Sequence, residues 1–376
     1  MRLAWFRAAT HVSDRLDDTA ALVGALGTEH EIELFGEARA HDFIRLDFRE
    51  PFDLCVFELA DTVGHAFVWA YLLHVRGVLR LRSLSLHDSR TQMLRRQHRE
   101  RDRVRELAVG DWDLVTAPIL ASRMTVVSDA HAAARLQRAC PAACVRHAPI
   151  GLGSDPGDDD HRGQTPIHGA TQRVESSHEG GLTPIVGSLQ NHVMQRALAR
   201  ARDAGARLDL LTGFPDDILD KADIVVATSW PPADESTMAL AGMATGRAVI
   251  VLETENTAGW PALDPQTWQP RGWTGQPPIV ISIDPRDEEH SLSLALRRLA
   301  TDAPLRASLG SAAHAWWQQH ATLDHAVHAW RSILAEAAAM SPPARPRNWP
   351  PHLSADGTER ARALLAEIGA TVDFLA

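Results

Sequence analysis

Short apolar runs alternate with helix-length amphipathic segments along most of this 376-residue chain. Runs of β-branched or aromatic residues that are bounded by polar residues predict buried strands of parallel sheets. The clearest case is residues 222–255, where the pattern predicts a strand at 222–229, a helix at 235–245 and a strand at 248–252. Strand, helix and strand in close succession predict a right-handed crossover unit.

Turn chemistry supports these boundaries. A Pro-Pro pair ends the first strand, since proline cannot donate to a strand ladder. Asp234 or Ser236 can cap the helix, and Gly246 terminates it. In sheets built from such units, ligands bind beyond the carboxyl ends of the strands. Residues 229–237 are therefore predicted to lie at the mouth of a ligand cleft.

The same alternation opens the chain, where a strand at 2–6, a helix at 19–26 and a strand at 31–35 form half of a Rossmann-like domain. Further predicted strands are 53–57, 124–128, 184–189, 208–212 and 279–283, and further predicted helices are 129–138, 193–204 and several between 291 and 340. Between these two sets, residues 151–182 are rich in Gly, Asp, Ser and His without periodicity, which is typical of a linker.

Composition narrows the class of protein. A hydrophobic content of 45% and a charged content of 23% are normal for a globular protein, and 376 residues suffice for two domains. The net charge of -10 argues against general nucleic-acid binding. With no long apolar run and no signal-peptide core, we expect a cytoplasmic protein. The three cysteines are expected to be free thiols.

Cationic groups are distributed unevenly. Lys221 is the only lysine, so a phosphate site must use arginine, histidine or backbone amides. Residues 90–105 hold seven arginines, which form either a solvated helix face or a surface for an anionic lipid, an anionic acceptor or a partner protein, the lipid being at the inner membrane face. Three consecutive acids at 158–160 precede a histidine, but acids in such a tract are usually solvated, and we expect no metal site.

Three segments carry a resemblance to a known family. The segment ADIVVATSWPPADESTMALAGMATGRAVIVLE resembles the nucleotide-sugar half of family 4 glycosyltransferases, which have the GT-B fold. LAWFRAATHV and the polar loop at 13–19 resemble the first strand and loop of that family. His65-Ala66-Phe67 matches a His-Ala-Phe segment that is common there.

The resemblance implies an α/β protein of two Rossmann-like domains that face each other across a cleft. It predicts an acceptor domain at 1–150, a linker at 151–182, a nucleotide-sugar domain at 183–340, and a proline-rich connector with a final helix at 341–376. The implied reaction moves a sugar from a nucleotide-sugar donor to a glycan or another hydroxyl acceptor, with retention of configuration and without a cofactor or an essential metal.

The resemblance also implies a set of site residues. Catalytic roles fall on His65 and Glu235. The residues expected to bind the donor are Asp14, Arg15, Arg196, Gly213, Ser236 and Thr237, and those expected on the acceptor side are Arg82 and His87. Each has a simpler interpretation: His65 as a structural histidine, Glu235 as a first-turn acid that stabilises the helix dipole, and the arginines as surface residues.

Three positions depart from the family pattern. Asp14 replaces a loop glycine, Val193 and Met194 occupy the positions of a basic pair, and Ala241 replaces an acid that holds the ribose. A carboxylate beside a diphosphate costs about 1–4 kcal/mol, so we expect weak donor binding that Asp14→Gly would tighten. These departures favour a degenerate, non-catalytic relative as the alternative, and a nucleotide-sugar epimerase is a third hypothesis.

Overall fold

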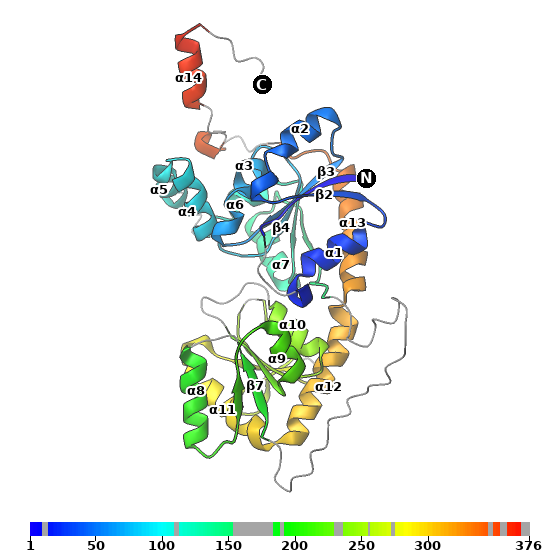
Figure 1. The fold of residues 1–376 in the computed structure, drawn as a ribbon, viewed down its shortest axis with the longest axis vertical. Helices are drawn as coiled ribbons and strands as arrows, with labels where there is room; N and C mark the ends of the chain where they lie inside the picture. The colour runs from blue at the N-terminus through cyan, green and yellow to red at the C-terminus, as the bar shows by residue number, and fades with distance from the viewer. Residues whose placement is uncertain are drawn as a thin grey trace. The chain divides into compact units, whose positions relative to one another are not determined.

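The chain forms two compact α/β units (Figure 1). This computed structural model describes residues 1–9, 14–108, 113–152, 183–188, 192–228, 236–254, 256–271, 275–344, 349–353 and 359–369. Unit 1 comprises the described residues within 1–10, 26–148 and 329–376, and unit 2 those within 11–25 and 149–328. By their contacts, residues 11–25 thus group with the second half of the chain and the C-terminal segment with the first.

Unit 1 is built on a six-stranded parallel sheet with the order β2-β1-β3-β4-β5-β6. Its strands are β1 (Arg2–Phe6), β2 (Glu31–Phe35), β3 (Leu54–Leu59), β4 (Val78–Leu81), β5 (Met124–Val127) and β6 (Val145–His147). Both β3 and β4 are buried along their whole length, as expected for central strands of a parallel sheet that is covered on both faces.

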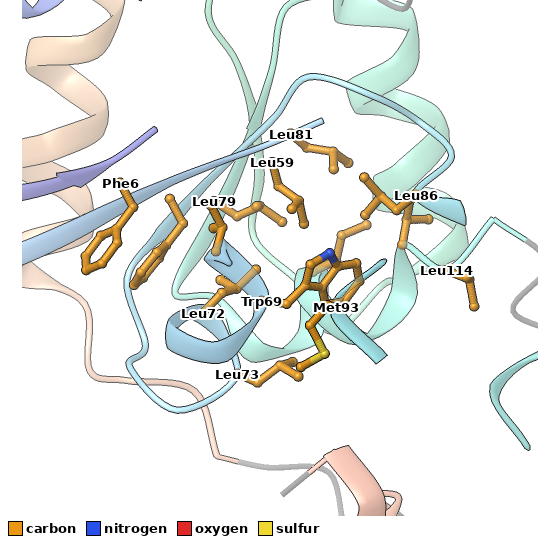
Figure 2. Packing of buried hydrophobic residues seen from close by; sticks show 14 of the residues in the cluster. Phe6, Leu59, Trp69, Leu72, Leu73, Leu79, Leu81, Leu86, Met93 and Leu114 are labelled. Carbon is orange, nitrogen blue, oxygen red and sulfur yellow. The ribbon is translucent and has the colours of Figure 1, made fainter. Parts of the chain in front are cut away.

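Unit 1 also contains helices. They are α2 (Asp42–Arg49), α3 (Val68–Leu72), α4 (His87–Arg96), α5 (Glu100–Ala108), α6 (Thr116–Ala121), α7 (Ala130–Ala139), the second part of α13 (Leu323–Ala339) and α14 (Glu359–Glu367). Figure 2 shows the main core, in which Phe6, Leu79 and Trp69 are fully or almost fully buried. On the other face of the sheet, Trp5 contacts Trp330 of α13 with ring centroids 5.2 Å apart.

Unit 2 is built on a seven-stranded sheet with the order β12-β11-β13-β10-β9-β7-β8, parallel except for β12. Its strands are β7 (Ile185–Ser188), β8 (Asp209–Leu211), β9 (Ile224–Ala227), β10 (Ala248–Leu252), β11 (Ala262–Leu263), β12 (Pro270–Arg271) and β13 (Val280–Ile283). Its helices are α8 (His192–Asp203), α9 (Pro215–Lys221), α10 (Thr237–Ala244), α11 (Glu288–Thr301) and α12 (Ala303–His320), together with most of α1 (Asp18–Leu26).

The predicted order of strand, helix and strand is confirmed, and β9 and β10 pair in parallel. Strand β9, helix α10 and strand β10 follow one another as expected, and α10 begins at Thr237. Gly246 has φ +67°, the left-handed conformation that ends a helix at low cost when the residue is glycine. The predicted free thiols are also confirmed, since Cys55, Cys140 and Cys144 form no disulfide.

A close backbone approach makes Gly310 of α12 sensitive to substitution. A Cβ atom at this position would lie 2.1 Å from the carbonyl oxygen of Gly246. We therefore expect Gly310→Ala to lower the free energy of unfolding by about 1–3 kcal/mol or more, measured by urea denaturation. The control is Gly24→Ala in α1, where nothing lies within 4 Å of the added methyl group and alanine is expected to stabilise the helix. Equal effects of the two changes would contradict this packing.

The arginine-rich segment at 90–105 is largely engaged within unit 1. Arg90 is 1% exposed and donates to Glu106, while Arg99 is 2.9 Å from Asp102. Arg96 forms an ion pair with Glu37. These pairs favour a structural role for part of the segment. In the part of the chain that the structure describes, no helix is long and apolar enough to cross a membrane.

Candidate functional site

A buried carboxylate lies in the centre of the unit 1 sheet. Glu58, in the otherwise apolar strand β3, is 2% exposed. Its Oε1 accepts a hydrogen bond from Trp5 Nε1 at 3.1 Å and one from Arg80 Nη1 at 2.9 Å. Arg80 is its partner in the register of β3 and β4, so both side chains lie on the same face of the sheet. The buried charge is thus paired and hydrogen-bonded, as a buried carboxylate must be.

Arg82 extends this charged group towards the carboxyl end of β4. Its guanidinium Nη1 lies 3.8 Å from Glu58 Oε2, and its backbone N–H donates to the carbonyl of Leu59 at 2.8 Å. Its side chain is 16% exposed, so it is held at the end of the strand rather than free on the surface. The predicted acceptor-side residue Arg82 therefore belongs to the same charged cluster as Glu58.

His65 follows the carboxyl end of β3, as the last residue of the short helix η3 (Val63–His65). It is 9% exposed, and its Nδ1 lies 2.8 Å from Thr62 Oγ1. Burial lowers the pKa of His65 to about 4; nearby Glu58 opposes this shift, and Arg82 and Arg7 add to it. At neutral pH the imidazole is therefore uncharged and can act as a hydrogen-bond donor or acceptor but not as a cation.

Asp61 connects the loop after β3 to the start of α4. Its Oδ1 accepts hydrogen bonds from the backbone N–H groups of Asp88 at 2.6 Å and Ser89 at 3.1 Å, which satisfies two free donors of the helix N-terminus. Burial raises the pKa of Asp61 despite these bonds, and the adjacent His87 lowers it. Within the described residues, the buried His87 Nδ1 has no hydrogen-bond partner.

Unit 1 thus brings together three of the predicted residues at the carboxyl ends of β3 and β4. His65 and Arg82 interact with the same carboxylate, Glu58, and His87 lies close to Asp61. The cluster combines the neutral imidazole of His65, the imidazole of His87, a guanidinium and two carboxylates, which is a set suited to binding hydroxyl groups. The individual roles assigned to these residues stay predictions.

In unit 2, both arginines that were predicted to bind the donor form ion pairs. Arg15 Nη1 lies 2.6 Å from Asp220 Oδ1, and both side chains are largely exposed. Arg196 Nε lies 2.7 Å from Glu289 Oε2, and Arg200 contacts the other oxygen of that carboxylate at 3.0 Å. Hydrogen bonds from these two arginines lower the pKa of Glu289.

The remaining predicted donor residues lie at or near the ends of helices of unit 2. Ser236 and Thr237 form the N-terminus of α10, and Gly213, with φ +146°, lies between β8 and α9. For Asp14 only the backbone is described, in the short helix η1 (Asp14–Leu16), and Glu235 lies outside the described residues. Of the positions that depart from the family pattern, Met194 and Ala241 are buried in the cores.

Comparison with known proteins identifies the architecture. No protein-family model matches the sequence, and no curated protein is similar to it. The chain is similar to the crystal structure of Anabaena HepE in complex with UDP and glucose, with a TM-score of 0.55 and 14% identity, over 89% of this chain and 100% of that chain. The UDP-glucose complex of HepE gives a TM-score of 0.53 and 13% identity, over 89% and 100%.

The catalytic domain of starch synthase IV from Arabidopsis thaliana, bound to ADP and acarbose, is similar as well. Its TM-score is 0.53 at 10% identity, over 90% of this chain and 99% of that chain. The fold is GT-B-like. The predicted fold class is thereby confirmed as an α/β protein with two Rossmann-like domains, one on a parallel sheet and one on a sheet that is parallel except for β12.

In this GT-B-like protein the Glu58–Arg80 pair was not predicted as part of the site. A signal was present, because each residue is a single charge within an apolar strand, and a charge at such a position must find a partner. The predicted strand at 53–57 stopped one residue before Glu58. Asp61 was missed as well, since its role depends on a helix that begins more than twenty residues later.

Proposed function

We propose that this chain is a retaining glycosyltransferase of the family 4 type, which moves a sugar from a nucleotide sugar to a hydroxyl acceptor without an essential metal. The observation that carries the proposal is the buried, neutral His65 beside Glu58 and Arg82 in a GT-B-like fold. The complexes of Anabaena HepE with UDP-glucose and of starch synthase IV with ADP and acarbose support a nucleotide-sugar donor.

In this proposal, residues 1–150 bind the acceptor and residues 183–340 bind the donor, while Asp14 and Arg15 of the first loop contribute to the donor site. The contact with Thr62 holds Nδ1 of His65, so Nε2 is available to a sugar or acceptor hydroxyl group. Arg82 and His87 contribute to the acceptor side. Amide groups at Ser236 and Thr237, at the N-terminus of α10, receive the departing diphosphate together with the helix dipole, and Glu235 lies next to them in the chain.

A second candidate is a catalytically degenerate relative that acts as a binding or partner module. The observation that favours it is the engagement of Arg15 by Asp220 and of Arg196 by Glu289, because these arginines are the basic groups expected to receive a diphosphate. Exposed ion pairs of this kind contribute little to stability, so a doubly charged ligand can displace them. The two candidates therefore predict different donor affinities: measurable binding for the transferase and no binding for the degenerate module.

Calorimetric titration with UDP-, GDP- and ADP-glucose tests the proposal. We expect weak binding of one donor to the wild type, and roughly two- to fivefold tighter binding to Glu289→Gln, which frees Arg196. The control is Asp284→Asn. In the wild type the Asp284 side chain pairs with Arg286 and is 29% exposed, which matches the 30% exposure of Glu289. Asp14→Gly is expected to tighten binding further.

Two outcomes would count against parts of this scheme. If no nucleotide sugar binds to any variant, the degenerate module is the better explanation. If the wild type binds a donor at low micromolar Kd and Asp14→Gly binds no more tightly, Asp14 does not face the phosphates.

A further inference from the structure

Unit 2 contains a cavity formed by none of the residues predicted to bind the donor. Its volume is about 340 Å³, at the lower end of the range of about 300–1,000 Å³ in which small-molecule sites fall. The turn after α8 supplies Ala204 and Ala206, and the later turns of α11 supply Leu294 and Arg297. Trp268, from the β11–β12 hairpin, lies against them.

Trp268 is held in a backbone conformation that is costly for a bulky residue. Its φ is +57°, in the left-handed region where glycine or asparagine is normally found. The hairpin enforces it: the N–H of Trp268 donates to the carbonyl of Asp264 at 2.7 Å, and the Asp264 carboxylate accepts from the N–H groups of Gln266 and Thr267. Strain that the surroundings impose on an aromatic residue is a mark of a functional position.

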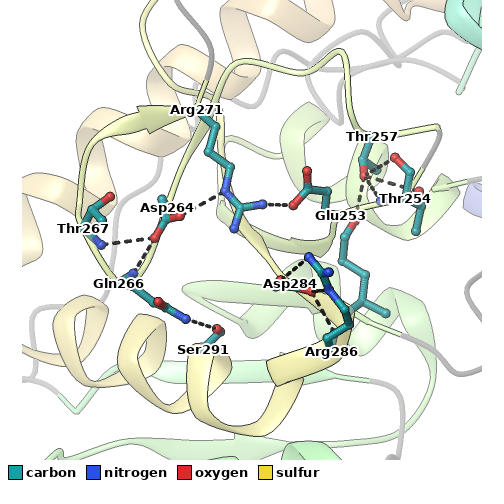
Figure 3. Close-up of polar contacts among 11 residues, drawn as sticks. Glu253, Thr254, Thr257, Asp264, Gln266, Thr267, Arg271, Asp284, Arg286 and Ser291 are labelled. Atoms are coloured by element: carbon teal, nitrogen blue, oxygen red, sulfur yellow. Dashed lines mark hydrogen bonds and ion pairs between the residues drawn. The ribbon is translucent and has the colours of Figure 1, made fainter.

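A polar network anchors this hairpin to the rest of unit 2 (Figure 3). Arg271 lies between Asp264, at 3.3 Å, and Glu253, which follows β10. Gln266 Nε2 contacts Ser291 Oγ at 3.4 Å near the start of α11. Because both ends of the hairpin are tied down, the indole of Trp268 is positioned against α11 before any ligand arrives.

The cavity presents hydrogen-bond donors against apolar walls. Within the described ranges, the exposed Arg297 guanidinium forms no ion pair and lines the cavity together with the partly buried Trp268. Arg298, whose guanidinium lies 5.6 Å from the centroid of the Trp268 ring, also lines the cavity and pairs with Asp302 at 2.8 Å. Donors of this kind favour a ligand with an anionic acceptor group, and the apolar walls favour one with a compact ring.

We propose that this cavity binds an acidic sugar unit of a glycan, with the carboxylate on Arg297 and the ring against Trp268. A uronate combines the two required properties, since its carboxylate accepts charge-assisted hydrogen bonds and its C–H face packs on an aromatic ring. The site is independent of the proposed transferase activity, because binding at this cavity requires neither a donor nor turnover.

Titration of the full-length protein with a glucuronyl-glucose disaccharide tests this site, with cellobiose as the neutral probe and sodium sulfate as the simple anion. We expect the acidic disaccharide to bind and cellobiose and sulfate to bind at least tenfold more weakly. Arg297→Gln is expected to weaken the acidic disaccharide about ten- to a hundredfold. Its matched control is Arg207→Gln, which removes the same charge from an exposed residue beside Ala206 that does not line the cavity.

A second variant tests the role of the indole. Trp268→Asn suits the left-handed backbone and removes the ring, so it should weaken binding while the hairpin stays folded. A melting temperature equal to that of Arg207→Gln would show that the fold is intact. Equal affinity for cellobiose, equal affinity for sulfate, or an Arg297→Gln variant that binds like the wild type would each overturn the proposal.

Discussion

Replacing Arg80 with methionine is expected to lower the free energy of unfolding by about 3–5 kcal/mol. Arg80 is 6% exposed and donates to the carboxylate of Glu58, which is 2% exposed and cannot reach water. Without its main partner the carboxylate stays a buried charge, with Trp5 and the more distant Arg82 beside it. Denaturation in urea, followed by circular dichroism, measures the loss.

Two further variants decide the cause of that loss. Arg45→Met removes an exposed arginine, 61% exposed and 3.2 Å from Asp42, and is expected to cost less than about 1 kcal/mol. The double variant Glu58→Met/Arg80→Met removes both buried charges and should recover much of the stability, apart from the acceptor that Trp5 loses. If Arg80→Met costs no more than Arg45→Met, Glu58 is not a desolvated charge.

Lowering the pH from about 6.5 to 4 is expected to remove about 3 kcal/mol of stability through His65 alone. In the folded protein its pKa is depressed to about 4, against 6.5 for an ordinary histidine. Between these values the unfolded chain takes up a proton that the folded protein does not, so the free energy of unfolding falls as the pH falls. Comparison of the wild type with His65→Asn over this range isolates the effect.

A matched control for that comparison is His41→Asn, since the side chain of His41 is 78% exposed. The pH dependence of this variant should follow the wild type, whereas that of His65→Asn should be flatter. In the proposed transferase, His65→Ala should also reduce turnover by about 10²–10⁴-fold. A pH dependence that is unchanged by His65→Asn would show that the imidazole is solvated, and turnover that is unchanged by His65→Ala would end its catalytic role.

Local pattern in the sequence determined part of the secondary structure. The alternation of apolar strands with amphipathic helices predicted β1, β2, β9 and β10 at or near their observed bounds. Gly246 marked the end of α10 because a left-handed residue is needed there and glycine adopts it freely. Such signals act over a few residues, so they can be recognised in a single chain without knowledge of the sheet order.

Partners that are distant in the sequence were decided only by the tertiary structure. Glu58 meets Arg80 because β3 and β4 are neighbours in the sheet, and Arg15 meets Asp220 across 205 positions of the chain. The family resemblance implied that Arg15 and Arg196 bind the donor, with a surface role as the alternative, and long-range packing placed a carboxylate beside each. Charge interactions depend on distance in space, which strand order and helix packing set and local sequence pattern does not.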